Sequence, residues 1–546
     1  MRKNIISFIL ALSMIGLTSC GASDTENSAY SGTKNNDSYN DNYYDIYDVE
    51  SSDDYVNENS IQQEYQNNGN FQEPSLENYS YTQENGFKSA KTEPLSTFSA
   101  DVDTASYTNI RRLINDNYKI PENAVRIEEM LNYFNYDYPQ PTDDTPFSST
   151  IEISDCPWNE NNKLMLVGLN TTSMNTEELP PSNIVFLLDV SGSMSDYDKL
   201  PLIQDAFTLL AENLRPCDRI SIVTYAGQDE VVLNGADGND IEKVKTAINN
   251  LTANGGTNGS SGIITAYDLA EKYFIQNGNN RVILATDGDL NMGITSEDEL
   301  QQLIESEREK GIYLSVLGVG SGNLNDSLLE TIADNGNGNY SYIDSINEAK
   351  KVLLNEMSST LYTIAKDVKF QIEFNPSYVD TYRLIGYDNR VLSNEDFNDD
   401  TKDAGEIGAG HKVTVLYELS LNDVKDDTIG STSNDWATLN IRYKNPNEDN
   451  SNLIQSGINE SFYSNTMPDN LGFASCVAEF GMLLKNSEHM ENSSYEGVLT
   501  RLNNIHSSIE NDDLKVEFEV LVAAYKYLLE NNSANDYYES YPVYYW

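Results

Sequence analysis

Five oxygen-bearing side chains, in three short segments near the middle of the chain, carry the clearest chemistry. The segments are Asp189-Val-Ser191-Gly-Ser193-Met194, Gly255-Gly-Thr257-Asn258 and Thr286-Asp287-Gly288-Asp289. The five side chains offer two carboxylates and three hydroxyls, with no histidine or cysteine. This hard, all-oxygen set suits Mg²⁺, with Mn²⁺ or Ca²⁺ as alternatives. We therefore predict a divalent-cation site formed by Asp189, Ser191, Ser193, Thr257 and Asp287.

The elements that would position these side chains form an α/β domain, predicted over residues 182–357. Apolar runs alternate there with amphipathic helical patterns, which indicates a mostly parallel, doubly wound sheet covered on both faces. The predicted strands are 184–188, 220–225, 282–286 and 312–319, with 231–233 as an antiparallel edge. Ligands collect at the carboxyl ends of such strands, where all three segments would meet.

The three segments resemble the metal-ion-dependent adhesion site (MIDAS) of von Willebrand factor type A (VWA) domains, with its D-x-S-x-S…T…D arrangement. The resemblance implies that Ser191, Ser193 and Thr257 offer hydroxyl oxygens, and that Asp189 and Asp287 hold the metal directly or through water. It also implies one open coordination position, filled by an Asp or Glu carboxylate of a protein partner. Two protein carboxylates only neutralise a divalent ion, so that position still favours an anionic oxygen.

Further polar residues flank this predicted site. Asp289, Asn291 and Asn258 would form a rim that contacts the ligand. Asp196 and Asp198 could hold a second cation, but a solvated acidic rim or a helix cap is the favoured interpretation.

The first residues resemble the signal of a bacterial lipoprotein. Arg2 and Lys3 precede an apolar run that is short for a membrane span, and Leu17-Thr-Ser-Cys20 resembles a lipobox. Cleavage after residues 1–19 would leave Cys20 to carry a diacylglycerol, which would anchor the protein in the cell envelope, facing outside the cytoplasm. The alternative is an ordinary signal peptide with a chance cysteine.

Residues 20–92 are rich in Asn, Asp, Ser, Tyr and Glu and lack a sustained apolar period. We predict a disordered acidic tether, although its tyrosines leave a ligand-binding tract open as an alternative.

The regions beside the VWA domain resemble one bacterial family. FSADVDTASYTNIRRLI and VRIEEMLNYFNYDYP are similar to the N-terminal extension of VWA lipoproteins of the YfbK type, and IAKDVKFQIEFNP and DAGEIGAGHKVTVLYEL are similar to their C-terminal module. We predict a helical unit at 93–145, strands at 146–181, a β-rich module at 358–466, helices at 467–531 and an aromatic tail at 532–546. The strands at 151–153 and 164–169 should pair with those of the β-rich module, so that the VWA domain is inserted into a β-sandwich.

Two smaller groups of residues receive structural interpretations. Asp101 and Asp103 have no other metal ligands nearby in the sequence, so we expect them to be turn and capping residues. Once Cys20 is acylated, the remaining Cys156, Cys217 and Cys476 indicate no disulfide framework and are interpreted as small, mostly buried hydrophobic residues.

Charge and missing motifs limit the classes of function. The formal net charge of −53 disfavours nucleic-acid binding. The three histidines form no HExxH motif or obvious triad, and neither a Walker loop nor a G-x-S-x-G elbow occurs. Three hypotheses remain: metal-dependent protein binding in adhesion or envelope assembly, a structural envelope protein with a fold-stabilising metal, and, as the least favoured, a metal-assisted hydrolase.

Overall fold

The computed structural model describes residues 77–142, 145–174, 179–255, 259–288, 297–356, 362–422, 434–446 and 448–539. The side chains of 259–261, 297 and 532–539 are outside this description. The predicted signal, Cys20 and the tether up to residue 76 also lie outside the described residues.

The last part of the predicted tether is structured, so its boundary at residue 92 is wrong. The Asn78 amide donates to the Leu324 carbonyl (2.9 Å), and the fully buried Ala90 donates its amide to the Asp380 carbonyl (2.9 Å). Strand β1 (Lys88–Ser89) pairs with β12 (Val379–Ile385). Backbone hydrogen bonds hold this stretch in place. Because they do not depend on apolar side chains, the sequence shows no apolar period there.

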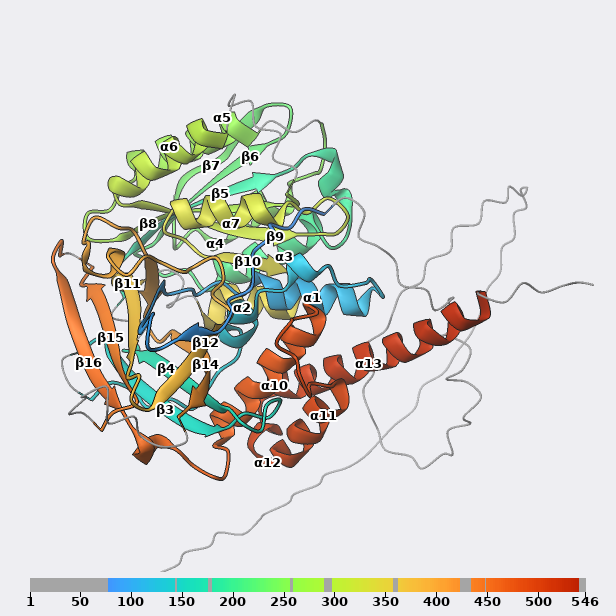
Figure 1. Ribbon diagram of the computed structural model, residues 1–546. Helices are drawn as coiled ribbons and strands as arrows, with labels where there is room; N and C mark the ends of the chain where they lie inside the picture. Colours follow the sequence, from blue (N-terminus) through green and yellow to red (C-terminus); the bar gives the residue numbers. More distant parts are fainter. Residues whose placement is uncertain are drawn as a thin grey trace, which may run out of the picture. The chain divides into compact units, whose positions relative to one another are not determined.

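The central domain contains the predicted doubly wound sheet (Figure 1). Its strands lie in the order β10 (Tyr340–Ile343), β9 (Ile312–Val319), β8 (Asn279–Thr286), β5 (Ser182–Asp189), β6 (Arg219–Tyr225) and β7 (Asp229–Asp237). All neighbours are parallel except β6 and β7, which pair in antiparallel fashion. The five predicted strands are confirmed, whereas the short β10 was not predicted.

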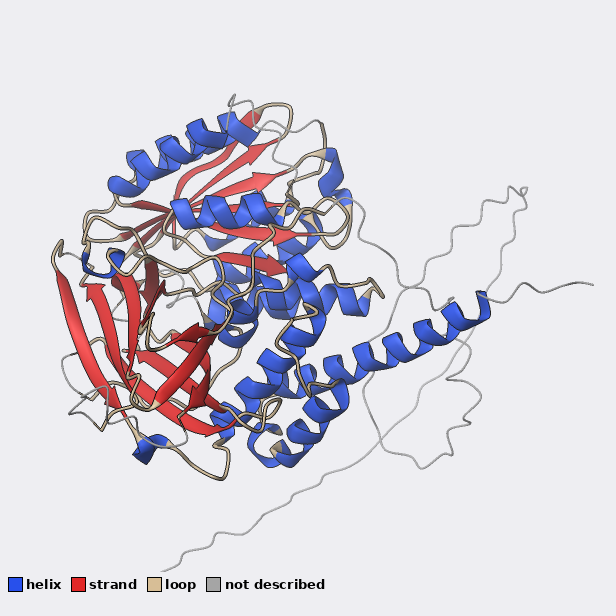
Figure 2. Ribbon diagram, viewed as in Figure 1, coloured by secondary structure: helices blue, strands red, loops and turns tan. Residues whose placement is uncertain are grey.

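Helices cover both faces of this sheet, as the alternating pattern predicts (Figure 2). One core contains residues of α3 (Leu200–Glu212), α4 (Ile241–Asn249) and α8 (Ile346–Lys350). The core on the other face contains residues of α5 (Gly259–Lys272), α6 (Glu297–Glu309) and α7 (Asp326–Asn335). Strands β5 and β8 are buried along their whole length, which explains the apolar runs 184–188 and 282–285 within them.

Two antiparallel sheets flank the central domain and share a hydrophobic core. The first sheet has the order β1, β12, β14 (Lys412–Leu421), β4 (Lys163–Thr171) and β3 (Phe147–Asp155). The second sheet has the order β13 (Gly405–Gly408), β11 (Thr363–Phe374), β15 (Ala437–Lys444) and β16 (Ser451–Ile458). Strand β2 (Leu95–Ser99) also pairs with β11. Strands β3 and β4 precede the central domain, and β4 pairs with β14 after it. The predicted insertion of the VWA domain into a β-sandwich is therefore confirmed.

A helical layer packs on the outer face of the first sheet, since Leu164, Leu166 and Leu416 belong to its core. Its helices are α1 (Ala105–Asn115), the 3₁₀ turn η2 (Glu122–Ala124), α2 (Ile127–Asn132), α10 (Asp469–Leu484), α11 (Tyr495–Asn504), α12 (His506–Ile509) and α13 (Asp513–Glu539). The predicted aromatic tail from residue 532 is wrong as far as residue 539, because α13 continues through it. No helix within the described residues is both long and apolar enough to span a membrane.

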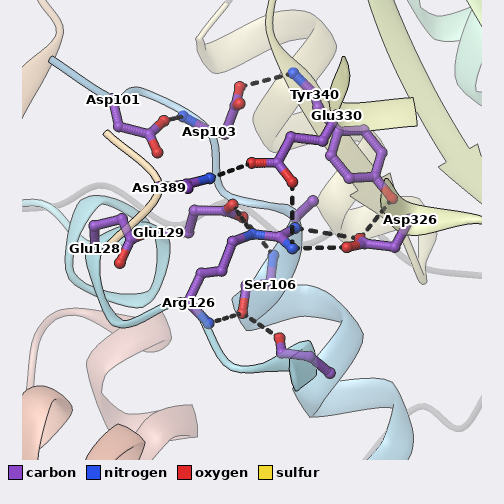
Figure 3. A network of polar contacts seen from close by, with 12 residues as sticks. Asp101, Asp103, Ser106, Arg126, Glu128, Glu129, Asp326, Glu330, Tyr340 and Asn389 are labelled. Atoms are coloured by element: carbon purple, nitrogen blue, oxygen red, sulfur yellow. Dashed lines mark hydrogen bonds and ion pairs between the residues drawn. The ribbon is translucent and has the colours of Figure 1, made fainter. Parts of the chain in front are cut away.

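A buried polar network joins the helical layer to the VWA domain (Figure 3). The Arg126 guanidinium, before α2, forms ion pairs with Glu129 and with two carboxylates of α7, at 2.7 Å from Asp326 and 3.5 Å from Glu330. Tyr340 of β10 donates its hydroxyl to Asp326 (3.0 Å). The network ties α2, α7 and β10 together.

Asp101 and Asp103 form the predicted turn, because the Asp103 amide donates to Asp101 Oδ1 (2.9 Å). Both also pair with Arg390, which the sequence did not indicate. Cys156, Cys217 and Cys476 are free thiols. The first and last are buried as predicted, whereas Cys217 is exposed, which corrects that prediction.

Candidate metal site

Strand β5 delivers Asp189 to the carboxyl edge of the central sheet. Its neighbours are β6 on one side and β8 on the other, and the chain leaves β5 through α3 towards β6. The edge between β5 and β8 is therefore a topological switch point, where α/β sheets bind ligands. Asp189 is completely buried there.

The loop after β5 folds its hydroxyls around Asp189. The Ser191 amide donates to Asp189 Oδ1 (2.8 Å), and the Ser191 and Ser193 hydroxyl oxygens lie 3.0 Å apart. Met194 is fully buried in the core beneath and anchors the loop, while Ser193 is exposed. The group is thus held from below and opens towards solvent.

Asp287 reaches the same place from the end of β8. The preceding Thr286 donates its hydroxyl to Asp189 Oδ2 (3.1 Å) and accepts a hydrogen bond from the Gly288 amide (3.2 Å). Hydrogen bonding to Ser193 also favours the ionised form of Asp287. Four of the five predicted metal ligands, from two separate loops, therefore lie together.

The third loop reaches the site at its described end. The Gly192 amide donates to the Gly255 carbonyl (3.1 Å), and the Asn254 amide donates to the Val190 carbonyl (2.7 Å). Gly255 has a φ of +94°, a conformation that suits glycine. The predicted ligand Thr257 and the predicted rim residues Asn258, Asp289 and Asn291 lie outside the described residues and stay predictions.

The two carboxylates have different electrostatic environments. Burial raises the pKa of Asp189 to about 6, although hydrogen bonds from Ser191 and Thr286 oppose this shift. Burial also disfavours the charge on Asp287, but hydrogen bonding to Asn323 and the adjacent Lys199 ammonium outweigh it and lower the pKa of Asp287 below its usual range. Asp287 is thus a preformed anion, while ionised Asp189 gains from a nearby cation.

These residues fit a divalent cation of the Mg²⁺ class. The donors are carboxylate and hydroxyl oxygens, and the Ser191 amide and the Thr286 hydroxyl orient the two Asp189 oxygens. Of the described residues, Asp189, Asp287, Ser191 and Ser193 would hold the ion. A bound ion would supply electrostatic attraction for an anionic oxygen.

Sequence reasoning missed one charged member of this site, Lys199. Its ammonium lies 3.0 Å from Asp287 Oδ2 and 3.2 Å from Asn323 Oδ1, and the residue is only 4% exposed. Lys199 follows Ser193 by six positions and directly precedes α3. Its position six residues after Ser193 was the only hint in the sequence that Lys199 lies near the site. A lysine before a helix, however, is usually exposed to solvent.

Other acidic residues do not share this environment. Asp196 is exposed and Asp198 is half-buried, which agrees with a solvated rim. Elsewhere, carboxylate oxygens of Asp367, Asp403 and Glu406 lie within 4.8 Å of one another. Each of these has a partner of its own: Lys444 and Arg308 pair with the two aspartates, and Asn337 donates to Glu406.

Three family models match the chain. Residues 73–166 match "von Willebrand factor", 183–355 match "von Willebrand factor type A domain", and 359–528 match "Uncharacterized protein YfbK, C-terminal". The second match covers the central sheet and the candidate site, and the third covers the later sandwich strands and the C-terminal helices.

Among curated proteins, the chain is 42% identical over 444 residues to "Uncharacterized protein YfbK" of Escherichia coli strain K12, a match that covers 78% of this chain and 77% of that protein. It is also 27% identical over 163 residues to inter-alpha-trypsin inhibitor heavy chain H3 of Mesocricetus auratus. That second match covers 28% of this chain and only 18% of the relative.

Solved structures resemble this chain only at low identity and low TM-score. A von Willebrand factor type A protein from Catenulispora acidiphila is 14% identical, with a TM-score of 0.41, and covers 66% of this chain and 87% of that one. BatB from Bacteroides thetaiotaomicron is 23% identical, with a TM-score of 0.28, and covers 32% of this chain and 97% of that one. Likeness at this level carries no functional information. The long match to the Escherichia coli protein, together with the matching VWA and C-terminal models, shows that this chain belongs to the YfbK family of von Willebrand factor type A domain proteins.

Proposed function

We propose that this protein binds a protein partner through a divalent cation, held by Asp189, Ser191, Ser193, Thr257 and Asp287, that accepts an Asp or Glu carboxylate of the partner. VWA domains typically mediate protein–protein interactions, and many depend on a metal. Mg²⁺ is the favoured ion, with Mn²⁺ or Ca²⁺ as alternatives. We expect the protein to be membrane-anchored through a lipid on Cys20, and to act in adhesion or envelope assembly.

The observation that carries this proposal is the meeting of acidic and hydroxyl side chains at the switch point. Asp189 is bonded to the Ser191 amide and the Thr286 hydroxyl, Ser191 and Ser193 face each other at 3.0 Å, and Ser193 opens the group to solvent. A purely structural metal would be enclosed by protein ligands. An exposed edge suits a ligand that arrives from outside.

The test is capture of envelope proteins by the purified protein, in Mg²⁺ and in a chelator. Asp189→Ala should abolish Mg²⁺-dependent capture while the circular dichroism spectrum stays unchanged. The control Asp196→Ala, which removes an exposed carboxylate from the same loop, should capture as the wild type does.

Two other outcomes favour the alternatives. Capture that survives both Asp189→Ala and chelation supports a structural envelope protein with a fold-stabilising metal. Turnover of a phosphoester or glycan library by the wild type, lost on chelation, supports a metal-assisted hydrolase, which would also need a positioned base beside the ion.

A further inference from the structure

Lys199 is an unusual neighbour for a cation site, because its positive charge lies beside the carboxylates that would hold the metal ion. Its ammonium contacts Asp287 Oδ2 at 3.0 Å, and both side chains are at most 5% exposed. A buried ion pair of this kind is screened little by salt. The ammonium charge of Lys199 therefore acts strongly on any group that lies next to Asp287.

The surrounding structure holds this ammonium in place. The lysine stem passes directly over Gly320, where an added Cβ would come within 2.3 Å of the Lys199 Cε atom. Gly320 has a φ of +72°, and its carbonyl accepts the Tyr342 hydroxyl at 2.6 Å. Asn323, from the same loop, accepts the second hydrogen bond of the ammonium. The β9–α7 loop is therefore shaped around the lysine.

The charges of the described groups then give a simple sum. Asp189 and Asp287 contribute −2, a divalent cation would contribute +2, and Lys199 contributes +1, so the loaded site carries a net charge of about +1. One carboxylate from a ligand brings the total to zero, whereas a neutral amide leaves an uncompensated positive charge. Without Lys199, the loaded site would already be neutral.

We propose that Lys199 determines the ligand specificity of this site: its ammonium lowers the affinity for the metal but makes the loaded site select an anionic ligand. This inference rests on the proposed function, because it requires a metal at Asp189 and Asp287. Two positive charges held by one carboxylate would lie on the order of 5 Å apart, which explains the cost to metal binding. The same charge strengthens attraction for the ligand carboxylate.

The experiment uses Lys199→Met, which keeps much of the aliphatic stem and removes the charge. Mn²⁺ affinity is measured by electron paramagnetic resonance of free Mn²⁺, and ligand affinity by titrating the Mn²⁺-loaded protein with N-acetylaspartate amide or its neutral analogue N-acetylasparagine amide. We expect Mn²⁺ to bind about tenfold more tightly to Lys199→Met, and the preference for the aspartate probe to fall about tenfold. Lys163→Met, which removes an ammonium paired with Asp155 in the sandwich, should change neither value.

Lys199→Gln provides a second route, because it removes the charge and leaves a side-chain amide that can still donate to Asp287. It should shift both values in the same directions as Lys199→Met. If Lys199→Met fails to fold, this variant decides the question.

Three results would overturn the inference. Weaker Mn²⁺ binding by Lys199→Met would mean that the lysine only positions Asp287, and an unchanged preference for the aspartate probe would mean that its charge does not select the ligand. Both leave the proposed function standing. Absence of Mn²⁺ binding by the wild type would overturn the proposed function and the inference together.

Discussion

At the scale of single residues, the candidate site is electrostatically uneven. Burial raises the pKa of Asp189 to about 6, while hydrogen bonding and the Lys199 charge lower that of Asp287. The sequence identifies both as acidic ligands but cannot distinguish their pKa values, because the difference comes from the burial of Asp189 and from Asn323 and Lys199 beside Asp287. These residues become neighbours only when β5, β8 and the loop after β9 meet.

The first prediction concerns Asp189. Asp189→Asn keeps the shape of the side chain but removes a charge from the metal ligands, so Mg²⁺ should no longer raise the melting temperature. At one hundred times the dissociation constant, the wild type should gain about 2.7 kcal/mol from Mg²⁺. Differential scanning fluorimetry in Mg²⁺ and in a chelator measures the shift in melting temperature. Asp196→Asn is the control, and an undiminished Mg²⁺ shift in Asp189→Asn would contradict the assignment.

The second prediction concerns Glu128 of α2, whose Oε2 accepts a hydrogen bond from the Tyr387 amide after β12 (2.8 Å). Burial, with the nearby charges of Asp388 and Asp101, raises its pKa to about 7. Because the folded state holds this proton more tightly than the unfolded state, the wild type loses stability as the pH rises from about 4.5 to 7.

Glu128→Gln is neutral at every pH and still offers an oxygen to the Tyr387 amide. It should therefore exceed the wild type in stability by about 1–3 kcal/mol at pH 8, and by little at pH 4. Urea denaturation at the two pH values tests this, with the exposed Glu122→Gln as control. An equal difference at both pH values would argue against the pKa shift.

At the scale of elements, the strands and helices with strong periodic patterns could be predicted. Strands β5, β6, β8 and β9, and the sandwich strands β3 and β4, agree with the sequence analysis. Most residues of β4, β5, β6, β8 and β9 are buried, and their apolar runs are visible in one sequence.

The elements that the sequence did not indicate are short or are held by distant partners. Strand β2 exists because it pairs with β11, about 270 positions later in the chain, and β13 has only four residues. Within the helical unit predicted at 93–145, the chain after Pro121 forms the 3₁₀ turn η2 and the separate helix α2. Arg126 lies between them, where its side chain reaches Asp326 of the VWA domain.

The third prediction concerns this junction. Arg126→Met removes the guanidinium shared by Glu129, Asp326 and Glu330 and leaves their carboxylates buried without it, which should cost about 3–5 kcal/mol. Lys245→Met, which breaks the more exposed pair with Glu212, should cost far less, because exposed ion pairs stabilise proteins little. Chemical denaturation compares them, and equal losses would show that the network does not stabilise the junction.

At the scale of the whole molecule, the VWA domain is an insertion whose two ends meet. The Tyr362 hydroxyl, at the start of the later sandwich strands, contacts the Pro180 carbonyl before β5 (2.9 Å) and the Ser182 hydroxyl at the start of β5 (2.8 Å). This closure, with the Arg126 network, ties the VWA domain to the sandwich and helices. The insertion was predictable from strand patterns on both sides, whereas these ties were not.

The fourth prediction follows from that connection. Trp158 and Trp436 lie in the helical and sandwich cores, the third tryptophan, Trp546, lies outside the described residues, and the VWA domain has no tryptophan. If the parts unfold together, Mg²⁺ bound in the VWA domain should raise the unfolding midpoint seen by tryptophan fluorescence as much as the midpoint seen by circular dichroism. A Mg²⁺ shift confined to circular dichroism would show that the VWA domain unfolds separately.

The most direct test of the central claim is the anomalous diffraction of Mn²⁺ in a crystal of this protein. The account predicts one strong peak coordinated by Asp189, Ser191, Ser193, Thr257 and Asp287, with a coordination position facing solvent or a ligand carboxylate. No peak at this edge of the sheet, or a peak held instead by Asp367, Asp403 and Glu406, would contradict it.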